Sequence, residues 1–212
     1  MNYISVTEAE GVIGLCVAQE FQRAGNPTRP AMGSTFRFFE VRHAESLPGL
    51  ETLTLMSALQ KVHGIPDFSV ATELLVDVTT KGEVLLRDLR RAGHNPVPFI
   101  ITSGVTSTIG TEGIMRIARR ELVAALGSLV QSARVTIAAS LPTAEALRTQ
   151  VEALRAKPAV DTVETPRADE TLGLALGLIA WRINSLGELA PVPPMGRPRE
   201  PKPFDPARFG LE

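Results

Sequence analysis

The chain of 212 residues is long enough for one large domain, or for one domain with a tail. Its 44% hydrophobic and 21% charged residues are typical of a globular protein, which excludes a disordered chain. The formal net charge of -1 excludes the overall basic excess of many nucleic-acid-binding proteins. Any contact with DNA must therefore come from a local patch or from a partner.

The single cysteine, Cys16, excludes an intramolecular disulfide and a cysteine-based zinc site. Its neighbours Leu15 and Val17 are apolar, which predicts a buried strand position for the thiol. The most apolar segment, residues 172–183, is too short and too often interrupted by glycine to span a membrane. No basic region followed by an apolar run marks a secretion signal, so we expect a cytoplasmic protein without membrane contact.

The first part of the chain predicts three strands followed by a helix. Residues 3–6 and 11–20 are expected to pair as strands around an acidic turn at residues 7–10. Alternating aromatic and polar residues suit a third strand over residues 34–43. Apolar side chains at helical spacing predict a helix over residues 50–62.

The middle of the chain predicts a strand, a helix and a second strand. An apolar run ends on Asp77, a pattern typical of a buried central strand over residues 73–78 with a carboxylate at its carboxyl end. A helix over residues 82–92, closed by Gly93, and a strand over residues 97–102 follow. This succession favours a parallel central sheet.

Beyond a loop expected at residues 103–113, which is rich in Gly, Ser and Thr, the remaining elements alternate between helix and strand. Helices are expected over residues 114–131, 143–157 and 170–186, and short strands over residues 134–138 and 160–165. From residue 191 onward many prolines occur in a basic segment, which predicts an extended tail because proline lacks a backbone donor. We therefore expect a folded domain over residues 1–188 and a tail over residues 189–212.

Several of these segments follow one another in a recognisable order. A central strand ends in Asp77, a Thr/Gly turn follows, and a leucine-rich helix closes on Ala92 and Gly93. The later segments are a strand at residues 97–104, a helix with a basic start at 118–126, and a helix with an acidic start at 169–176 that leads to Trp181. Over residues 3–181 this order resembles the nuclease domain of the large terminase family, which packages DNA in phages and prophages.

The resemblance implies an α/β fold of the ribonuclease-H-like type, a mixed sheet flanked by helices. In that family carboxylates hold paired Mg²⁺ or Mn²⁺ ions, which activate water and stabilise the leaving oxygen during phosphodiester cleavage. Such hard cations need several oxygen ligands, so three acidic positions must converge. The resemblance also implies a location in a bacterial host cytoplasm or in association with a virion.

The resemblance places two acidic positions on strands. Asp77 matches the carboxylate of the central strand, although a carboxylate at a strand end can also fix a turn or cap a helix. The carboxylate of the first strand falls at Thr7, whose neutral hydroxyl replaces a metal-bridging acid poorly. Its neighbour Glu8 should point to the opposite face because side chains alternate along a strand. Glu10 could take this place only if the turn were rearranged.

The third acidic position lies at the start of the closing helix. The paired acids of the family fall there at Glu170 and Thr171, with Asp169 just before them. The expected catalytic residues are therefore Asp77, Glu170 and Glu8, and Asp169 joins these three as an expected metal ligand. Of the three acidic positions, the one at Asp77 is kept, the one at Glu170 is changed conservatively, and the one at Thr7 is lost.

Arginines near the expected start of the helix over residues 114–131 are candidates for DNA contact. Arg116, Arg119 and Arg120 could follow a phosphate backbone, and the alternative is a solvated basic face. Double-stranded DNA is the partner that this cluster would bind.

Two functions remain open at this point. The first is a catalytically impaired nuclease-like domain that binds DNA or protein during phage DNA packaging or head assembly, with packaging or capsid proteins docking on the tail at residues 191–212. The second is an active endonuclease that depends on Mg²⁺ or Mn²⁺, of the terminase type or similar to a resolvase. Fold alone does not separate them, because function depends on the site.

Overall fold

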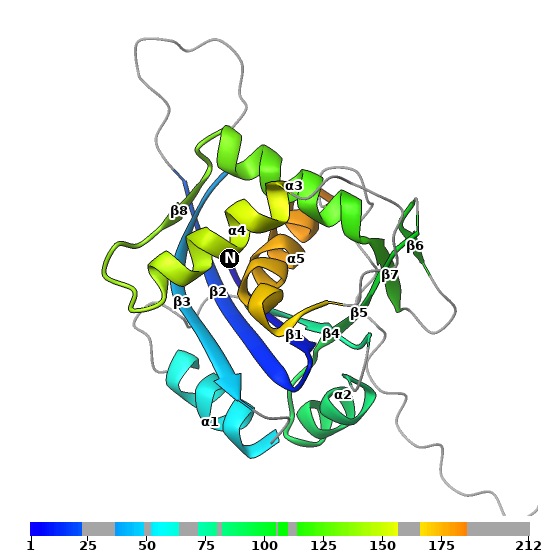
Figure 1. Ribbon diagram of the computed structural model, residues 1–212. Coiled ribbons are helices and arrows are strands. Elements are labelled where there is room, and N and C mark those ends of the chain that lie inside the picture. Colours follow the sequence, from blue (N-terminus) through cyan, green and yellow to red (C-terminus); the bar gives the residue numbers. More distant parts are fainter. Residues whose placement is uncertain are drawn as a thin grey trace, which may run out of the picture.

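The computed structural model describes residues 1–22, 37–48, 52–63, 72–79, 82–104, 106–109, 114–156 and 166–185. These residues form an α/β fold around an 8-stranded mixed sheet with the strand order β6-β7-β5-β4-β1-β2-β3-β8 (Figure 1). The strands are β1 (Asn2–Ala9), β2 (Val12–Gln22), β3 (Arg37–Pro48), β4 (Thr72–Asp77), β5 (Val97–Thr102), β6 (Thr108–Ile109), β7 (Met115–Ala118) and β8 (Val135–Ile137). The helices are α1 (Thr52–His63), α2 (Gly82–Arg91), α3 (Arg119–Gln131), α4 (Ala144–Ala156), the short 3-10 helix η1 (Ala168–Glu170) and α5 (Thr171–Ser185).

The strands divide into an antiparallel and a parallel part. β2 runs antiparallel to both β1 and β3. The pairs β1–β4, β4–β5 and β5–β7 are parallel. The expected strand–helix–strand unit is β4, α2 and β5, which confirms the parallel pairing predicted for the centre of the sheet. The mixed sheet flanked by helices is compatible with the ribonuclease-H-like layout that the sequence resemblance implies.

Helices cover both faces of the sheet. Side chains of α3, α4 and α5 pack with Tyr3 and Cys16 in one core, and those of α1 and α2 pack with Ile4 and Val6 in the other. Residues of β1 therefore alternate between the two cores, as the pleat of a strand requires. Cys16 is completely buried, which confirms its predicted core position.

The helix α5 lies between the sheet and the helices α3 and α4, and its side chains are buried continuously from residue 171 to residue 183. It lies so close to β2 that a Cβ atom at Gly14 would be 2.5 Å from the backbone of Thr171. Only glycine allows this approach. The start of α5 is thereby fixed against the strands that carry the expected acidic centre.

Two short connections follow from local backbone chemistry. Glu10 and Gly11 form the two-residue link between β1 and β2, and both have positive φ, 51° and 80°, as a tight hairpin turn of this kind requires. At the end of α2, Gly93 has a φ of 89° and its amide donates to the carbonyl of Arg90. This confirms the predicted helix stop at Gly93.

Three predicted elements are wrong in detail. The acidic turn is confined to Glu10 and Gly11, because residues 7–9 continue the strand β1. The first residues of the expected helix over residues 114–131 form the strand β7, since alternate side chains there point into the core, and the helix begins at Arg119. The expected loop at residues 103–113 contains the short strand β6. The strand expected at residues 160–165 and the tail from residue 189 lie outside the described residues.

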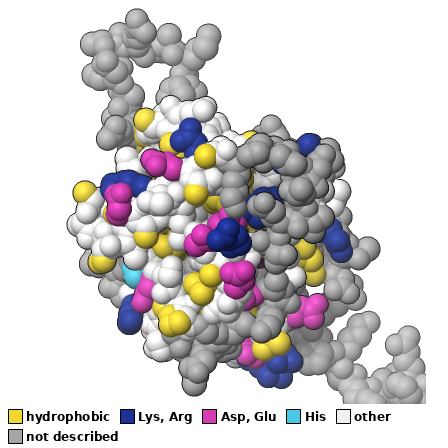
Figure 2. Space-filling model, viewed as in Figure 1, with side chains coloured by type: hydrophobic (Ala, Val, Ile, Leu, Met, Phe, Trp, Pro, Cys, Tyr) yellow, Lys and Arg dark blue, Asp and Glu magenta, His cyan; other side chains and the backbone are white. Residues whose placement is uncertain are grey.

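On the face drawn in Figure 2, basic and acidic side chains are interspersed, in keeping with the net charge of -1. Within the described residues, no helix combines the length and the apolar character that crossing a membrane requires.

Candidate functional site

The parallel strands β1 and β4 bring Thr7 and Asp77 to the same edge of the sheet. Val6 pairs with Val76, so the next residue of each strand, Thr7 or Asp77, follows at the same level. Tyr3 on β1 and Leu75 on β4 both belong to the core that contains α5. Because side chains alternate along a strand, Thr7 and Asp77 point toward this same helix.

Asp77 is 2% exposed, and hydrogen bonds hold one of its two carboxylate oxygens. Oδ1 accepts from the amide of Thr79 at 2.9 Å and from the Thr79 hydroxyl. The Thr79 hydroxyl oxygen in turn accepts from the amide of Ile101 on β5 at 2.9 Å. The carboxylate is thus fixed to the neighbouring strand, whereas its buried Oδ2 has no hydrogen-bond partner among the described residues.

The pKa of Asp77 is raised from 3.8 to about 6. Burial is the main cause, because removal from water penalises the charged form, and the nearby carboxylate of Glu8 adds to the effect. The hydrogen bonds from Thr79 act in the opposite direction. A buried carboxyl with a raised pKa and an unsatisfied oxygen is typical of functional sites, although structural groups can share these properties.

Thr7 and Ser5 attach the strand β1 to α5 through hydroxyl groups. The Thr7 hydroxyl donates to the carbonyl oxygen of Thr171 at 2.7 Å, and the Ser5 hydroxyl donates to that of Ala175 at 2.6 Å. Two residues along a strand and four along a helix both span roughly 6–7 Å, so the two contacts repeat in register. The position matched to the first-strand acid is therefore a structural contact with the closing helix.

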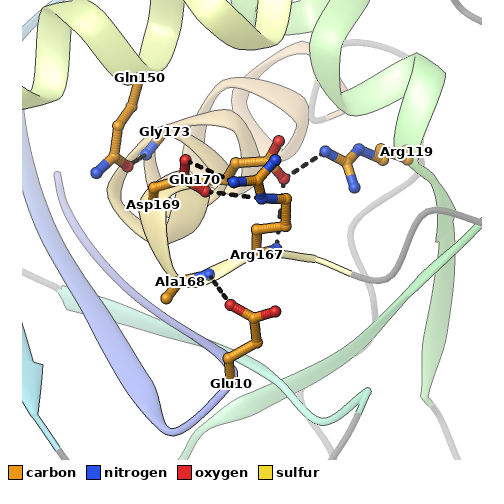
Figure 3. A network of polar contacts seen from close by, with 8 residues as sticks. All are labelled: Glu10, Arg119, Gln150, Arg167, Ala168, Asp169, Glu170 and Gly173. Atoms are coloured by element: carbon orange, nitrogen blue, oxygen red, sulfur yellow. Dashed lines mark hydrogen bonds and ion pairs between the residues drawn. The ribbon is translucent and has the colours of Figure 1, made fainter.

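Glu8 and Glu10 contact the backbone around the hairpin. Glu8 is buried, and its carboxylate accepts from the amide of Gly11 at 2.9 Å. The Glu10 carboxylate accepts from the amide of Ala168 at 3.0 Å, which joins the β1–β2 turn to η1 (Figure 3).

Glu170, the matched acid of the closing helix, pairs with an arginine. Its carboxylate lies 2.6 Å from the guanidinium of Arg119 at the start of α3 (Figure 3). The side chains are only 5% and 18% exposed, respectively. A charge-assisted hydrogen bond between such poorly hydrated groups is strong, and leaving either charge alone would be costly. No local sequence pattern indicates this pair, because Glu170 and Arg119 are far apart in the chain.

Asp169 points away from this pair. It forms an ion pair with Arg167 at 3.3 Å, and its side chain is 68% exposed. Nearby, the Gln150 side chain of α4 accepts from the amide of Gly173 at 3.0 Å, which ties the first turn of α5 to α4 (Figure 3). We refer to Asp77, Thr7, Thr171, Glu170 and Arg119 as the Asp77 site.

The donors around Asp77 do not fit a pair of divalent cations. Such ions need several oxygen ligands with negative charge, but Thr7 offers a hydroxyl that already donates to Thr171. The guanidinium of Arg119 neutralises Glu170. The described residues contain no group of at least three His, Cys, Asp or Glu side chains that could hold a metal ion.

The arginines expected to contact DNA lie in different environments. Arg116 is exposed on β7, Arg119 is paired with Glu170, and Arg120 is exposed in the first turn of α3. They do not share a single helix face, since the helix begins at Arg119.

No protein-family model and no curated protein sequence matches this chain.

Proposed function

We propose that this chain is a ribonuclease-H-like domain of the terminase-nuclease type that has lost its metal centre and acts as a binding component of phage DNA packaging or head assembly. The strand order β5-β4-β1-β2-β3, with β2 antiparallel to both neighbours, supports this fold type. The position of Asp77 at the carboxyl end of β4, beside the start of α5, supports the alignment with the nuclease family.

One observation carries the loss of catalysis: the residues matched to two of the three acids serve other contacts. Thr7 is a hydrogen-bond donor to the closing helix, and Glu170 is the partner of Arg119. The guanidinium supplies a positive charge beside the carboxylate where the family implies a metal ion. The guanidinium of Arg119 cannot activate water as a metal ion does. The arrangement therefore favours a structural role for Thr7 and Glu170.

Metal binding tests this proposal directly. We expect the purified chain to show no Mn²⁺-dependent cleavage of plasmid DNA and no saturable Mn²⁺ binding in calorimetry. The double variant Thr7→Asp, Arg119→Gln restores one acid and releases another, and we expect it to gain Mn²⁺ binding. Asp77→Ala in that background should abolish the gain. Saturable Mn²⁺ binding by the unmodified chain that requires Asp77 would refute the loss of the metal centre.

The proposed binding role extends to the proline-rich segment at residues 191–212. Proline-rich segments dock on partners at a low entropic cost because they are already extended. We expect packaging or capsid proteins to be the partners. Truncation after Ala190 should abolish their co-purification with the chain, and unchanged co-purification would remove the role assigned to this segment.

The second candidate is an active endonuclease that uses Mg²⁺ or Mn²⁺. It is favoured by the buried Oδ2 of Asp77, which no described residue contacts through a hydrogen bond, and by the raised pKa of this carboxyl. Asp77 and Glu170, with Glu8 or Glu10, would hold the ions only after Glu170 leaves Arg119 and the glutamate of the hairpin leaves its backbone partner. Plasmid cleavage in Mn²⁺ that disappears in Asp77→Ala would establish this activity. Cleavage that survives the substitution would come from another site or from a contaminant.

A further inference from the structure

A groove of about 590 Å³ lies beside α2, and none of its lining residues belongs to the Asp77 site. Its lining combines cationic and apolar groups. The arginines Arg87, Arg90 and Arg91 come from the last two turns of α2, and the apolar side chains are Leu86, Pro98 and Ile114. We call this hollow the α2 groove. Figure 2 shows dark-blue side chains at the end of the molecule where Figure 1 places α2.

The guanidinium groups of the α2 groove are available to a ligand. Arg87 and Arg91 lie 3.7 and 3.8 Å from Asp88, with side chains 57% and 73% exposed. Ion pairs at such exposed positions are weak. Arg90 forms no ion pair with any residue that the structure describes. Among the described residues that line the groove, the acidic one is Glu83, in the first turn of α2.

Helix stability alone does not explain this arrangement. Positive charges in the last turn of a helix interact favourably with its carbonyl end, which accounts for Arg90 and Arg91. It does not account for Arg87, one turn earlier, or for the convergence of all three side chains on one hollow. The Cβ atoms of residues three and four apart on a helix are about 5–6 Å apart, so Arg87, Arg90 and Arg91 form one cluster of arginines along the groove.

The cluster continues onto the sheet. Met115 and Ile117 of β7 point into the core beneath α3 and α5, so Arg116 between them points to the side of α1 and α2. Its partner in register is Ile100, which packs against the core of α1 and α2. Arg116 is exposed and lies two residues after Ile114, which lines the α2 groove. One of the arginines expected to contact DNA is thus placed beside this cluster.

We propose that the α2 groove binds the phosphate backbone of double-stranded DNA. Guanidinium groups pair with phosphates through two parallel hydrogen bonds, and the apolar lining suits the sugars between them. Phosphate contacts of this kind position a protein on DNA without reading its sequence. The inference deepens the proposed binding role, because it assigns that role to a place distant in the chain from the proline-rich segment.

Binding to a fluorescently labelled DNA duplex, measured by anisotropy over a salt series between about 50 and 200 mM, tests the proposal. The test variant replaces Arg87, Arg90 and Arg91 by Gln. The matched control replaces Arg42, Arg148 and Arg155, exposed arginines on β3 and α4, by Gln and so removes the same charge.

We expect the full-length chain to bind the duplex more weakly as salt is added. The slope of the logarithm of the binding constant against the logarithm of the salt concentration should decrease in magnitude by about 1 for each arginine removed from the α2 groove. The control variant should keep the slope of the unmodified chain, because Arg42, Arg148 and Arg155 do not line the α2 groove. Both triple variants lose the same charge, so a difference between them depends on where the arginines lie. Circular dichroism of each variant shows that the fold is retained.

Three results would overturn the proposal. The unmodified chain could fail to bind the duplex, both triple variants could lose binding equally, or polyglutamate could displace the duplex as efficiently as unlabelled DNA. The last result would mean that the groove takes an acidic peptide. None of the three affects the truncation test of the proline-rich segment, so the failure of this inference is distinguishable from failure of the proposed packaging role.

Discussion

Replacing Asp77 by Asn tests whether its buried carboxyl destabilises the fold when it ionises. The pKa of Asp77 is raised from 3.8 to about 6, mainly by burial. The folded state therefore holds this proton more tightly than the unfolded chain does. The stability that the protonated carboxyl contributes is fully present below about pH 4 and is lost as the pH rises through about 6. One pKa unit corresponds to about 1.4 kcal/mol, so ionisation costs the fold up to about 3 kcal/mol at neutral pH.

An asparagine amide has the shape of the protonated carboxyl and cannot ionise. It can accept from Thr79 as Oδ1 of Asp77 does. We therefore expect Asp77→Asn to leave the free energy of unfolding almost unchanged at about pH 4 and to raise it by up to about 3 kcal/mol above about pH 7. Urea unfolding followed by circular dichroism at several pH values measures this difference.

Asp169→Asn is the matched control, because the side chain of Asp169 is 68% exposed. This substitution should change the free energy of unfolding by no more than about 0.5 kcal/mol at any pH. A difference between Asp77→Asn and the unmodified chain that is constant with pH would refute the reasoning. So would a variant that is less stable than the unmodified chain at neutral pH. The first result would mean that the pKa of Asp77 is the same in the folded and the unfolded chain, and the second that the charged carboxylate stabilises the fold.

Two further predictions concern packing and a buried ion pair, and both are measured by urea unfolding. Gly14→Ala should destabilise the fold by about 1–3 kcal/mol because the new Cβ would lie 2.5 Å from the Thr171 backbone. Gly127→Ala in α3 is the control: the nearest side-chain atom is 4.0 Å away, so this substitution should stabilise the fold by up to about 1 kcal/mol. Equal effects of the two substitutions would contradict the close approach of α5. Arg182→Met should cost about 3–5 kcal/mol because it leaves Glu73, 2.7 Å away and 12% exposed, without its partner. The double variant with Glu73→Leu should recover most of this loss, and no recovery would mean that Arg182 contributes mainly through packing.

The central elements of the fold follow from local sequence patterns. The strand that ends on Asp77, the helix α2 with its stop at Gly93, and the strand β5 match the sequence predictions because each is marked by a strong local signal. The strand β7 lies where the sequence predicts helix, because four residues are too few for periodicity to separate strand from helix. Arg119, expected near the start of that longer helix, is the first residue of α3 in the structure.

The sequence by itself determined which chemical groups the chain has: a carboxyl at position 77, a hydroxyl instead of an acid at position 7, and a cluster of arginines in α2. Only the tertiary structure decided what these groups contact. Thr7 meets Thr171 because Gly14 lets α5 approach the sheet, and Glu170 meets Arg119 because α3 and η1 converge at the same edge. Such contacts join residues far apart in the chain, and local patterns carry no information about them because they depend on how whole helices pack on the sheet.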